Sequence, residues 1–200
     1  MVTYTVTFKD HNGAILKTET VEKGKAATAP AAPAREYFTF AGWDKSFDNV
    51  TADLVVTATY TASNTVIYAE DITVNKGTGE VTVNIRVVNN PGIMGAVLKV
   101  SVDDTMFAFE RGSKTQFPGL NLTVPGSGVT ASPYTFMLDA LELSGDDRKD
   151  GTLFSVTFKV KDTSVTGTYN VTLSCDNGAI FDENYHAPNA VLGKGTITIK

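Results

Sequence analysis

The feature that most constrains the fold is a two-residue alternation of apolar and polar side chains. In the segment 3–10, TYTVTFKD, the apolar Tyr4, Val6 and Phe8 alternate with threonine and lysine. The same pattern returns in DLVVTATY, EVTVNIRVV, AVLKVSV, TLFSVTFKV, TYNVTLS and GTITIK. Because successive side chains of a strand point to opposite faces of a sheet, this period predicts half-buried β-strands.

Turn sequences separate the predicted strands. They are DHNG at 10–13, NNPG at 89–92, PGSG at 125–128, SGDDRKDG at 144–151 and DNG at 176–178. No sustained helical spacing of apolar residues is present, and Pro30 and Pro33 limit a possible helical turn at 24–34. Many short strands about 8–12 residues apart predict an all-β chain built as a sandwich.

Composition narrows the possible partners. The 200 residues carry a net charge of −5, whereas nucleic-acid binding needs clustered lysine and arginine, so we expect no nucleic-acid partner. No run reaches the ~18 apolar residues of a membrane span, so no membrane insertion is expected. Cys175 is the single cysteine, which excludes an internal disulfide. The sequence shows neither a signal peptide nor a sorting tail, and we expect it to be a piece of a longer protein.

A polar segment, TASNT at 61–65, predicts a boundary between a domain at 1–62 and a domain at 66–200. The first domain is close to the lower size limit for folding without disulfides or metals. Its aromatic residues are therefore expected to supply most of its core. They are Phe38, Phe40, Trp43, Phe47 and Tyr60.

Residues 3–61 resemble the Listeria–Bacteroides repeat, also called the internalin B-type repeat. The resemblance is carried by YTVTFKDHNGAILKTETVEKGKAATAP and the following FTFAGWDKSFDNVTADLVVTATY. Asn12 and Gly13 are expected to supply the positive φ angles of a tight hairpin turn. The resemblance implies a small β-grasp-like module of bacterial surface proteins without an enzymatic role.

Residues 66–200 resemble a cohesin domain. The matching pieces are VTVNIRVVNNPGIMGAVLKVSVDD at 81–104, TFMLDALELSG at 135–145, DGTLFSVTFKVKDTSVTGTYNVTLS at 150–174 and the closing GKGTITIK. The resemblance implies a nine-stranded jelly-roll sandwich that binds a dockerin-bearing protein through one sheet face, as cellulosome scaffoldins do. It implies no cofactor, calcium carried by the partner, and an extracellular or cell-surface location in a Gram-positive-like bacterium.

Side-chain parity predicts which rows of this sandwich face the core. In GAVLKVSV and FMLDALELSG the inward rows are expected to be Leu98, Val100 and Val102, and Phe136, Leu138 and Ala140. The opposite rows are predicted to form a partner-binding face, because an exposed apolar patch is typical of an interface. Its residues are Gly95, Val97, Lys99, Ser101, Met137, Asp139, Leu141 and Glu142. Well-studied cohesins carry Asn and Asp where this chain has Gly95 and Val97, which implies a more apolar face and another dockerin subtype.

The remaining polar clusters do not predict catalysis or metal binding. His11 and His186 lie far from each other, and neither has a cysteine or a second histidine nearby, so a zinc site is not expected. The acidic loop at 144–151 lacks the Asp-x-Asp-x-Asp-Gly pattern of a calcium loop, so a solvated turn is expected, and FDEN at 181–184 is interpreted in the same way. No nucleophile elbow or distinct carboxylate pair is present. We therefore expect neither an enzyme nor a metal site.

Two other functions stay open at this stage. A carbohydrate-binding module on the same sandwich would bind polysaccharide through exposed aromatic residues, with Phe117, Tyr134, Tyr169 and Tyr185 as candidates. A purely structural adhesin stalk would bind no ligand. Fold alone does not decide among these functions.

Overall fold

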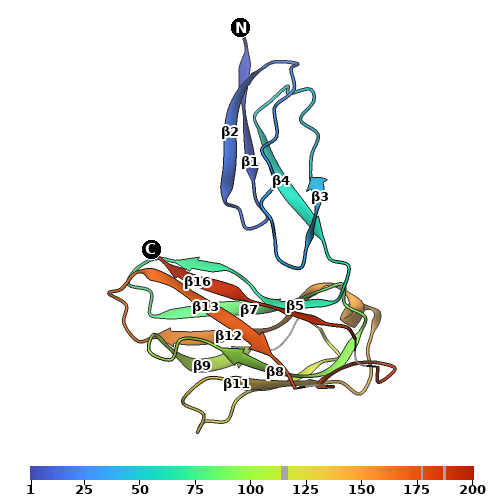
Figure 1. Ribbon diagram of the computed structural model, residues 1–200, viewed down its shortest axis with the longest axis vertical. Helices are drawn as coiled ribbons and strands as arrows, with labels where there is room; N and C mark the ends of the chain where they lie inside the picture. Colours follow the sequence, from blue (N-terminus) through green and yellow to red (C-terminus); the bar gives the residue numbers. More distant parts are fainter. Residues whose placement is uncertain (114–116, 177, 187) are drawn as a thin grey trace. The chain divides into compact units, whose positions relative to one another are not determined.

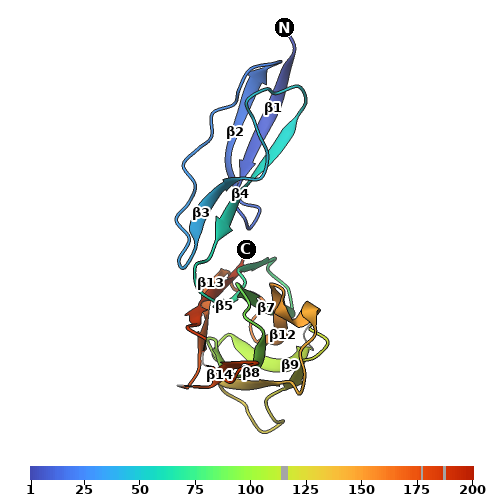
Figure 2. The same ribbon diagram turned by 90° about the vertical axis from the view of Figure 1, so that its right-hand side faces the viewer.

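The computed structural model describes residues 1–113, 117–176, 178–186 and 188–200. The chain forms two compact units, Met1–Ser63 and Asn64–Lys200, which are described separately. Nearly all regular structure is β, as predicted (Figures 1 and 2), and a single 3₁₀ turn, η1 (Gly145–Arg148), is the exception among the described residues. No helix of the described parts has the length and apolarity to cross a membrane.

The first unit is one four-stranded sheet in the order β2-β1-β4-β3. Its strands are β1 (Thr3–Lys9), β2 (Ile15–Glu22), β3 (Thr39–Trp43) and β4 (Leu54–Thr61). The central pair, β1 and β4, is parallel, whereas the outer pairs are antiparallel. The segment 24–34 contains no helical turn, because Pro30 and Pro33 each remove a backbone donor and hold the chain extended.

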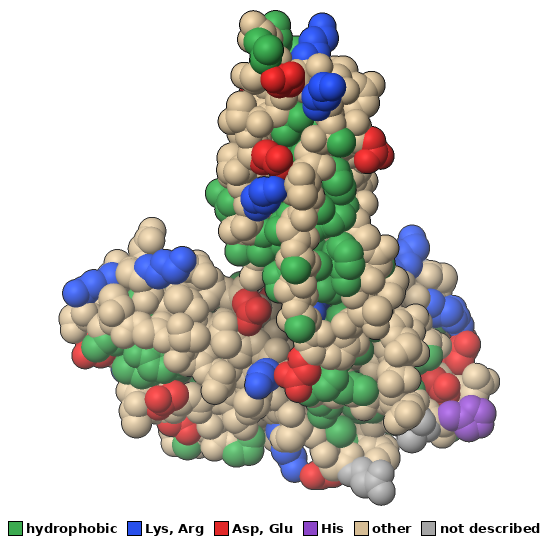
Figure 3. All heavy atoms as spheres, turned by 45° about the horizontal axis from the view of Figure 1, so that its top comes forward, with side chains coloured by type: hydrophobic (Ala, Val, Ile, Leu, Met, Phe, Trp, Pro, Cys, Tyr) green, Lys and Arg blue, Asp and Glu red, His purple; other side chains and the backbone are tan. Residues whose placement is uncertain are grey.

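The core of the first unit is centred on Phe8 and not on the five predicted aromatic residues. Phe8 is fully buried on a central strand, and Trp43 and Phe47 pack edge-on against it with ring centroids 5.1 and 5.2 Å away. Phe40, near the start of the edge strand β3, is 40% exposed. Figure 3 shows hydrophobic side chains, in green, along this unit. Of the five aromatic residues predicted to supply this core, Trp43 and Phe47 are half-buried and pack against it. The prediction was wrong for Phe38, Phe40 and Tyr60, which do not belong to the core cluster.

The hairpin between β1 and β2 uses one positive φ angle and not two. Gly13 has a φ of 85°, and its N–H donates to the carbonyl of Asp10 over 2.9 Å. The Asn12 side chain accepts a hydrogen bond from the N–H of Ala14 at 3.0 Å, and its own φ is not positive. The expectation for Asn12 was wrong because this carboxamide closes the turn without a left-handed backbone.

The second unit is a sandwich of two sheets (Figures 1 and 2). The first sheet has the order β10-β11-β8-β13-β16-β6, with β14 also paired to β8, and the second has the order β15-β5-β7-β12-β9. The strands of the first sheet are β6 (Ile72–Val74), β8 (Ile93–Ser101), β10 (Asn121–Thr123), β11 (Tyr134–Asp139), β13 (Gly167–Ser174), β14 (Ile180–Asp182) and β16 (Gly195–Ile199). Those of the second are β5 (Val66–Ala69), β7 (Glu80–Val88), β9 (Phe107–Ser113), β12 (Gly151–Val160) and β15 (Val191–Gly193).

The described part of this unit has more strand segments than the nine of the implied jelly roll. Two stretches change sheets and are each divided into two strands, β5 with β6 and β15 with β16. In both sheets these stretches pair with each other in parallel. They close the sandwich at one edge, and the predicted jelly-roll architecture is confirmed.

The core of the sandwich consists of the inward rows of both sheets. Phe136 on β11 stacks on Phe154 on β12, with ring centroids 4.7 Å apart and both side chains fully buried. On β8 and β11 the inward rows are those predicted, since Leu98, Val100, Phe136 and Leu138 are all buried. Val102 and Ala140 lie just beyond the strand ends and are half-buried.

Candidate partner-binding face

The outer face of β8 and β11 carries the predicted residues in cross-strand rows. In the register of this antiparallel pair Met137 lies opposite Val97, Asp139 opposite Gly95, and Thr135 opposite Lys99. Directly opposite side chains on one face of a sheet are neighbours, with Cβ atoms about 4.5–5.5 Å apart. Met137 is 48% exposed and Val97 is half-buried, so an apolar pair lies open at the centre of this face.

A third strand covers one of the predicted positions. Phe181 on β14 lies opposite Gly95 on the other side of β8, and its ring occupies the space above this glycine. A Cβ atom placed on Gly95 would lie 2.1 Å from Cζ of Phe181. Gly95 is therefore buried, and the expectation that it is open to a partner was wrong, because the missing side chain makes room for the aromatic ring.

Sequence reasoning missed Phe181 as a residue of this face. The signal available was Gly95 itself, since a glycine inside a strand often marks the close approach of another group. The identity of that group depends on β14, which has three residues and pairs with the early part of β8.

Tyr185 extends the aromatic surface that begins at Phe181. The two rings are stacked, with centroids 5.9 Å apart and an interplanar angle of 14°, and Tyr185 is 76% exposed. Its backbone has a φ of 60°, which is uncommon for a residue other than glycine. Two hydrogen bonds close this turn, from the N–H of Tyr185 to the carbonyl of Asp182 and from the N–H of Asp182 to the carbonyl of His186, each 3.0 Å long.

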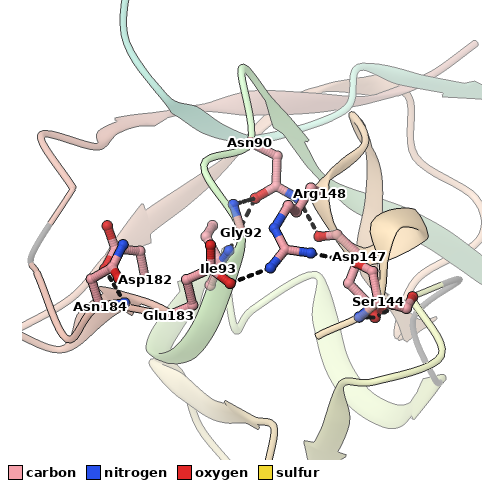
Figure 4. A network of polar contacts seen from close by, with 9 residues as sticks. All are labelled: Asn90, Gly92, Ile93, Ser144, Asp147, Arg148, Asp182, Glu183 and Asn184. Carbon is pink, nitrogen blue, oxygen red and sulfur yellow. Dashed lines mark hydrogen bonds and ion pairs between the residues drawn. The ribbon is translucent and has the colours of Figure 1, made fainter. Parts of the chain in front are cut away.

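The Asp182 side chain further stabilises the same turn. Its Oδ1 accepts hydrogen bonds from the N–H groups of Asn184 at 2.9 Å and His186 at 3.0 Å. Next to it, Glu183 forms an ion pair with Arg148, and Nη1 of Arg148 donates to the carbonyl of Ser144 over 3.0 Å (Figure 4). The turn that carries Tyr185 is thus attached to the loop around η1.

Asn90 attaches the start of β8 to the same loop (Figure 4). Its Oδ1 accepts from the N–H groups of Gly92 and Ile93, both at 3.1 Å. Its Nδ2 donates to the carbonyls of Asp147 and Lys149, at 2.9 and 3.0 Å. One carboxamide therefore satisfies four backbone groups and holds the turn before β8 against the loop after β11.

Asp147 corrects the prediction of a solvated turn at 144–151. Its carboxylate is fully buried and accepts hydrogen bonds from the N–H of Gly119 at 3.0 Å, the N–H of Ser144 at 2.7 Å and the Ser144 hydroxyl at 2.8 Å. Burial alone would raise the pKa of this carboxyl, but these hydrogen bonds and the nearby Arg148 outweigh it, and the pKa lies below 3.8. The turn is not solvated at Asp147 because this carboxylate closes the loop.

The acidic side chains of the described residues do not converge on a metal position. No group of three or more His, Cys, Asp or Glu residues in the described ranges is placed to hold an ion. Asp150 accepts a hydrogen bond from the N–H of Asn90 at 3.2 Å, and Asp147 and Asp182 likewise accept hydrogen bonds from backbone N–H groups.

The far part of the face is polar. Nζ of Lys99 lies 2.8 and 3.0 Å from the two carboxylate oxygens of Asp176, just after β13. Ser101 lies opposite Thr172 on β13. Leu141 and Glu142 lie beyond the end of β11, which stops at Asp139, and Leu141 is 91% exposed. The predicted residues therefore fall into an apolar centre, a polar end and a protruding loop.

The four aromatic residues considered for carbohydrate binding do not form an exposed platform. Tyr134 and Phe117 are buried in the core, and Tyr169 packs edge-on against Phe107 with centroids 5.3 Å apart. These three were wrong as candidates for sugar stacking because their strand parity and loop position direct them inward. Tyr185 is the candidate of this set that is exposed.

The second unit is thus a two-sheet sandwich whose outer face exposes Met137 and part of Val97. Two known family models match the chain. The model of the cohesin domain matches residues 70–199, and the model of the Listeria–Bacteroides repeat domain matches residues 4–70. The chain therefore belongs to the cohesin family, whose members are non-catalytic interaction modules, and it carries a Listeria–Bacteroides repeat ahead of the cohesin domain.

Solved structures agree in fold. A non-cellulosomal cohesin from the archaeon Archaeoglobus fulgidus is 18% identical with a TM-score of 0.54, covering 69% of this chain and 92% of its own. A type I cohesin–dockerin complex from Clostridium thermocellum contains a chain 16% identical with a TM-score of 0.56, covering 69% and 100%. The seventh ScaB type I cohesin from Pseudobacteroides cellulosolvens is 24% identical with a TM-score of 0.54, covering 68% and 92%. None of the curated proteins compared with the chain matches it.

Proposed function

We propose that the unit Asn64–Lys200 binds a dockerin-bearing protein through the outer face of β8, β11 and β14. The observation that carries this proposal is the open apolar pair of Val97 and Met137, which lies beside Phe181 on the outer face of this sheet. Membership in the cohesin family supports a polypeptide partner, and the complex from Clostridium thermocellum contains a dockerin.

We place the module outside the cell or on its surface, where cohesin domains typically occur, and a Gram-positive-like source stays a prediction. The partner brings its own calcium. The Listeria–Bacteroides repeat acts as a spacer or adhesion unit ahead of the cohesin domain.

Replacing Val97 with aspartate is expected to weaken dockerin binding about 30-fold, since loss of an interface anchor costs about 2 kcal/mol. Leu141→Asp is expected to act in the same direction if the loop after β11 contacts the partner. Titration calorimetry of the full chain against dockerin-bearing proteins of the source organism measures both effects. Val55→Asp is the matched control, because Val55 is an exposed strand valine of the first unit, and it should leave the affinity unchanged.

Equal affinities for wild type, Val97→Asp and Leu141→Asp would assign dockerin binding to another surface. Failure of every dockerin to bind, combined with retardation of the chain in gels containing soluble polysaccharide, would favour the carbohydrate-binding alternative. Absence of both interactions would favour a structural stalk.

A further inference from the structure

We infer that the stacked Phe181 and Tyr185 are the specificity anchor of this face, and that the partner surface they fit is apolar at its centre and basic at the end next to Asp139 and Glu142. This inference rests on the proposed docking function and adds the chemistry of the partner.

Contacts within the chain fix the backbone that carries the two rings. Phe181 fits over Gly95 at a distance that leaves no space for a side chain there, and Tyr185 stacks on its outer side. The turn between them is closed by four hydrogen bonds that involve Asp182, and Glu183 is paired with Arg148. Tyrosine has only two side-chain torsions, so ordering Tyr185 on this fixed backbone costs little conformational entropy, and aromatic side chains are frequent among the residues that dominate interface energies.

The rings continue the apolar centre of the face. Across the sheet, Asp139, Gly95 and Phe181 form one row, and Met137 and Val97 form the next outward-facing row. The Phe181 ring above Gly95 therefore lies on the same side of the sheet as Val97 and one row from it. Together Val97, Met137, Phe181 and Tyr185 present a contiguous apolar surface on three strands and one turn.

The charges around this surface are asymmetric. Lys99 is paired with Asp176 at one end, and Arg148 is paired with Glu183 beside the turn. Among the described residues, no basic side chain forms an ion pair with Asp139 or Glu142, and both of these carboxylates are exposed. A partner that carries lysine or arginine at this end would complement them, whereas a neutral or acidic partner would be disfavoured.

The first test removes the anchor. Tyr185→Ala and Phe181→Ala are each expected to weaken binding of the full chain to its dockerin-bearing partner at least 30-fold in calorimetry. The matched control is Tyr37→Ala, because Tyr37 is also an exposed tyrosine with a positive φ, in the first unit, and its removal should change affinity less than twofold. Circular dichroism spectra and thermal midpoints should show that each variant is folded.

The second test neutralises the acidic end. The double variant Asp139→Asn with Glu142→Gln is expected to bind about 10-fold more weakly at low ionic strength and to show a flatter dependence of affinity on salt. Glu110→Gln, an exposed carboxylate on β9 of the other sheet, should keep the salt dependence of the wild type.

The outcomes separate this inference from the proposed function. If Val97→Asp weakens binding but Tyr185→Ala and Phe181→Ala do not, docking stands and the aromatic anchor is overturned. If the anchor variants weaken binding but the neutralised variant keeps both affinity and salt dependence, the basic partner surface is overturned. If Val97→Asp, Tyr185→Ala and Phe181→Ala all leave the affinity unchanged, the docking face itself is misassigned.

Discussion

Replacing Phe136 with alanine is expected to lower the free energy of unfolding of the second unit by about 3–5 kcal/mol. Phe136 is fully buried, stacks on Phe154 of the opposite sheet, and lies 5.8 Å from the ring of Phe109. Its removal would leave a cavity between the two sheets where neither backbone can close the gap. This is a large fraction of the stability of a domain of this size.

Urea denaturation followed by far-ultraviolet circular dichroism of the full chain measures this loss. Trp43 is the single tryptophan of the chain and belongs to the first unit, so its fluorescence reports on that unit separately. Phe136→Leu serves as the conservative control and should recover much of the stability. A loss below about 1 kcal/mol for Phe136→Ala would contradict the packing between β11 and β12.

Replacing Asp147 with alanine is expected to cost about 3 kcal/mol at neutral pH. The substitution removes a fully buried acceptor and leaves the N–H groups of Gly119 and Ser144 without their partner. An unsatisfied buried donor costs about 1–3 kcal/mol, and hydrogen bonds to a charged group are among the stronger ones. Asp150→Ala is the control in the same loop, since Asp150 is exposed, and a much smaller loss is expected.

The cost of Asp147→Ala should depend on pH in a defined direction. The hydrogen bonds hold the pKa of Asp147 in the folded protein below the ordinary value of 3.8, so the folded state binds the proton less readily than the unfolded state. The stabilisation is therefore complete well above pH 3.8 and is lost as the pH falls through the lower folded pKa. The difference in unfolding free energy between wild type and Asp147→Ala should shrink from pH 7 to pH 3. A difference that grows over this range would contradict the assigned hydrogen bonds.

The inward rows of the sandwich were predictable because strand geometry is local. The alternation in GAVLKVSV and FMLDALELSG correctly placed Leu98, Val100, Phe136 and Leu138 in the core. The two resemblances were also recoverable from ordered motifs, and both families are confirmed by the matching models. The same parity holds just beyond the strand ends, where Val102 and Ala140 are half-buried and pack against the core.

Local patterns were a poor guide where a residue's surroundings come from another part of the chain. Asp147 lies in a segment whose composition is typical of a solvated acidic turn. Its carboxylate is nevertheless buried, and the N–H of Gly119, from a distant loop, donates a hydrogen bond to it. Phe40 is a large aromatic residue of the kind expected in a core, but its side chain is exposed on the edge strand β3.

The sequence by itself determined the all-β class, the two families and the side of each principal strand that faces the core, because all of these depend on residues close together in the chain. Only the tertiary structure decided the surface of the proposed docking face. It pairs β14 with β8, seats Phe181 over Gly95 and attaches the turn of Tyr185 to Arg148. These contacts join segments far apart in sequence, and no periodicity within one strand specifies which neighbour that strand will have.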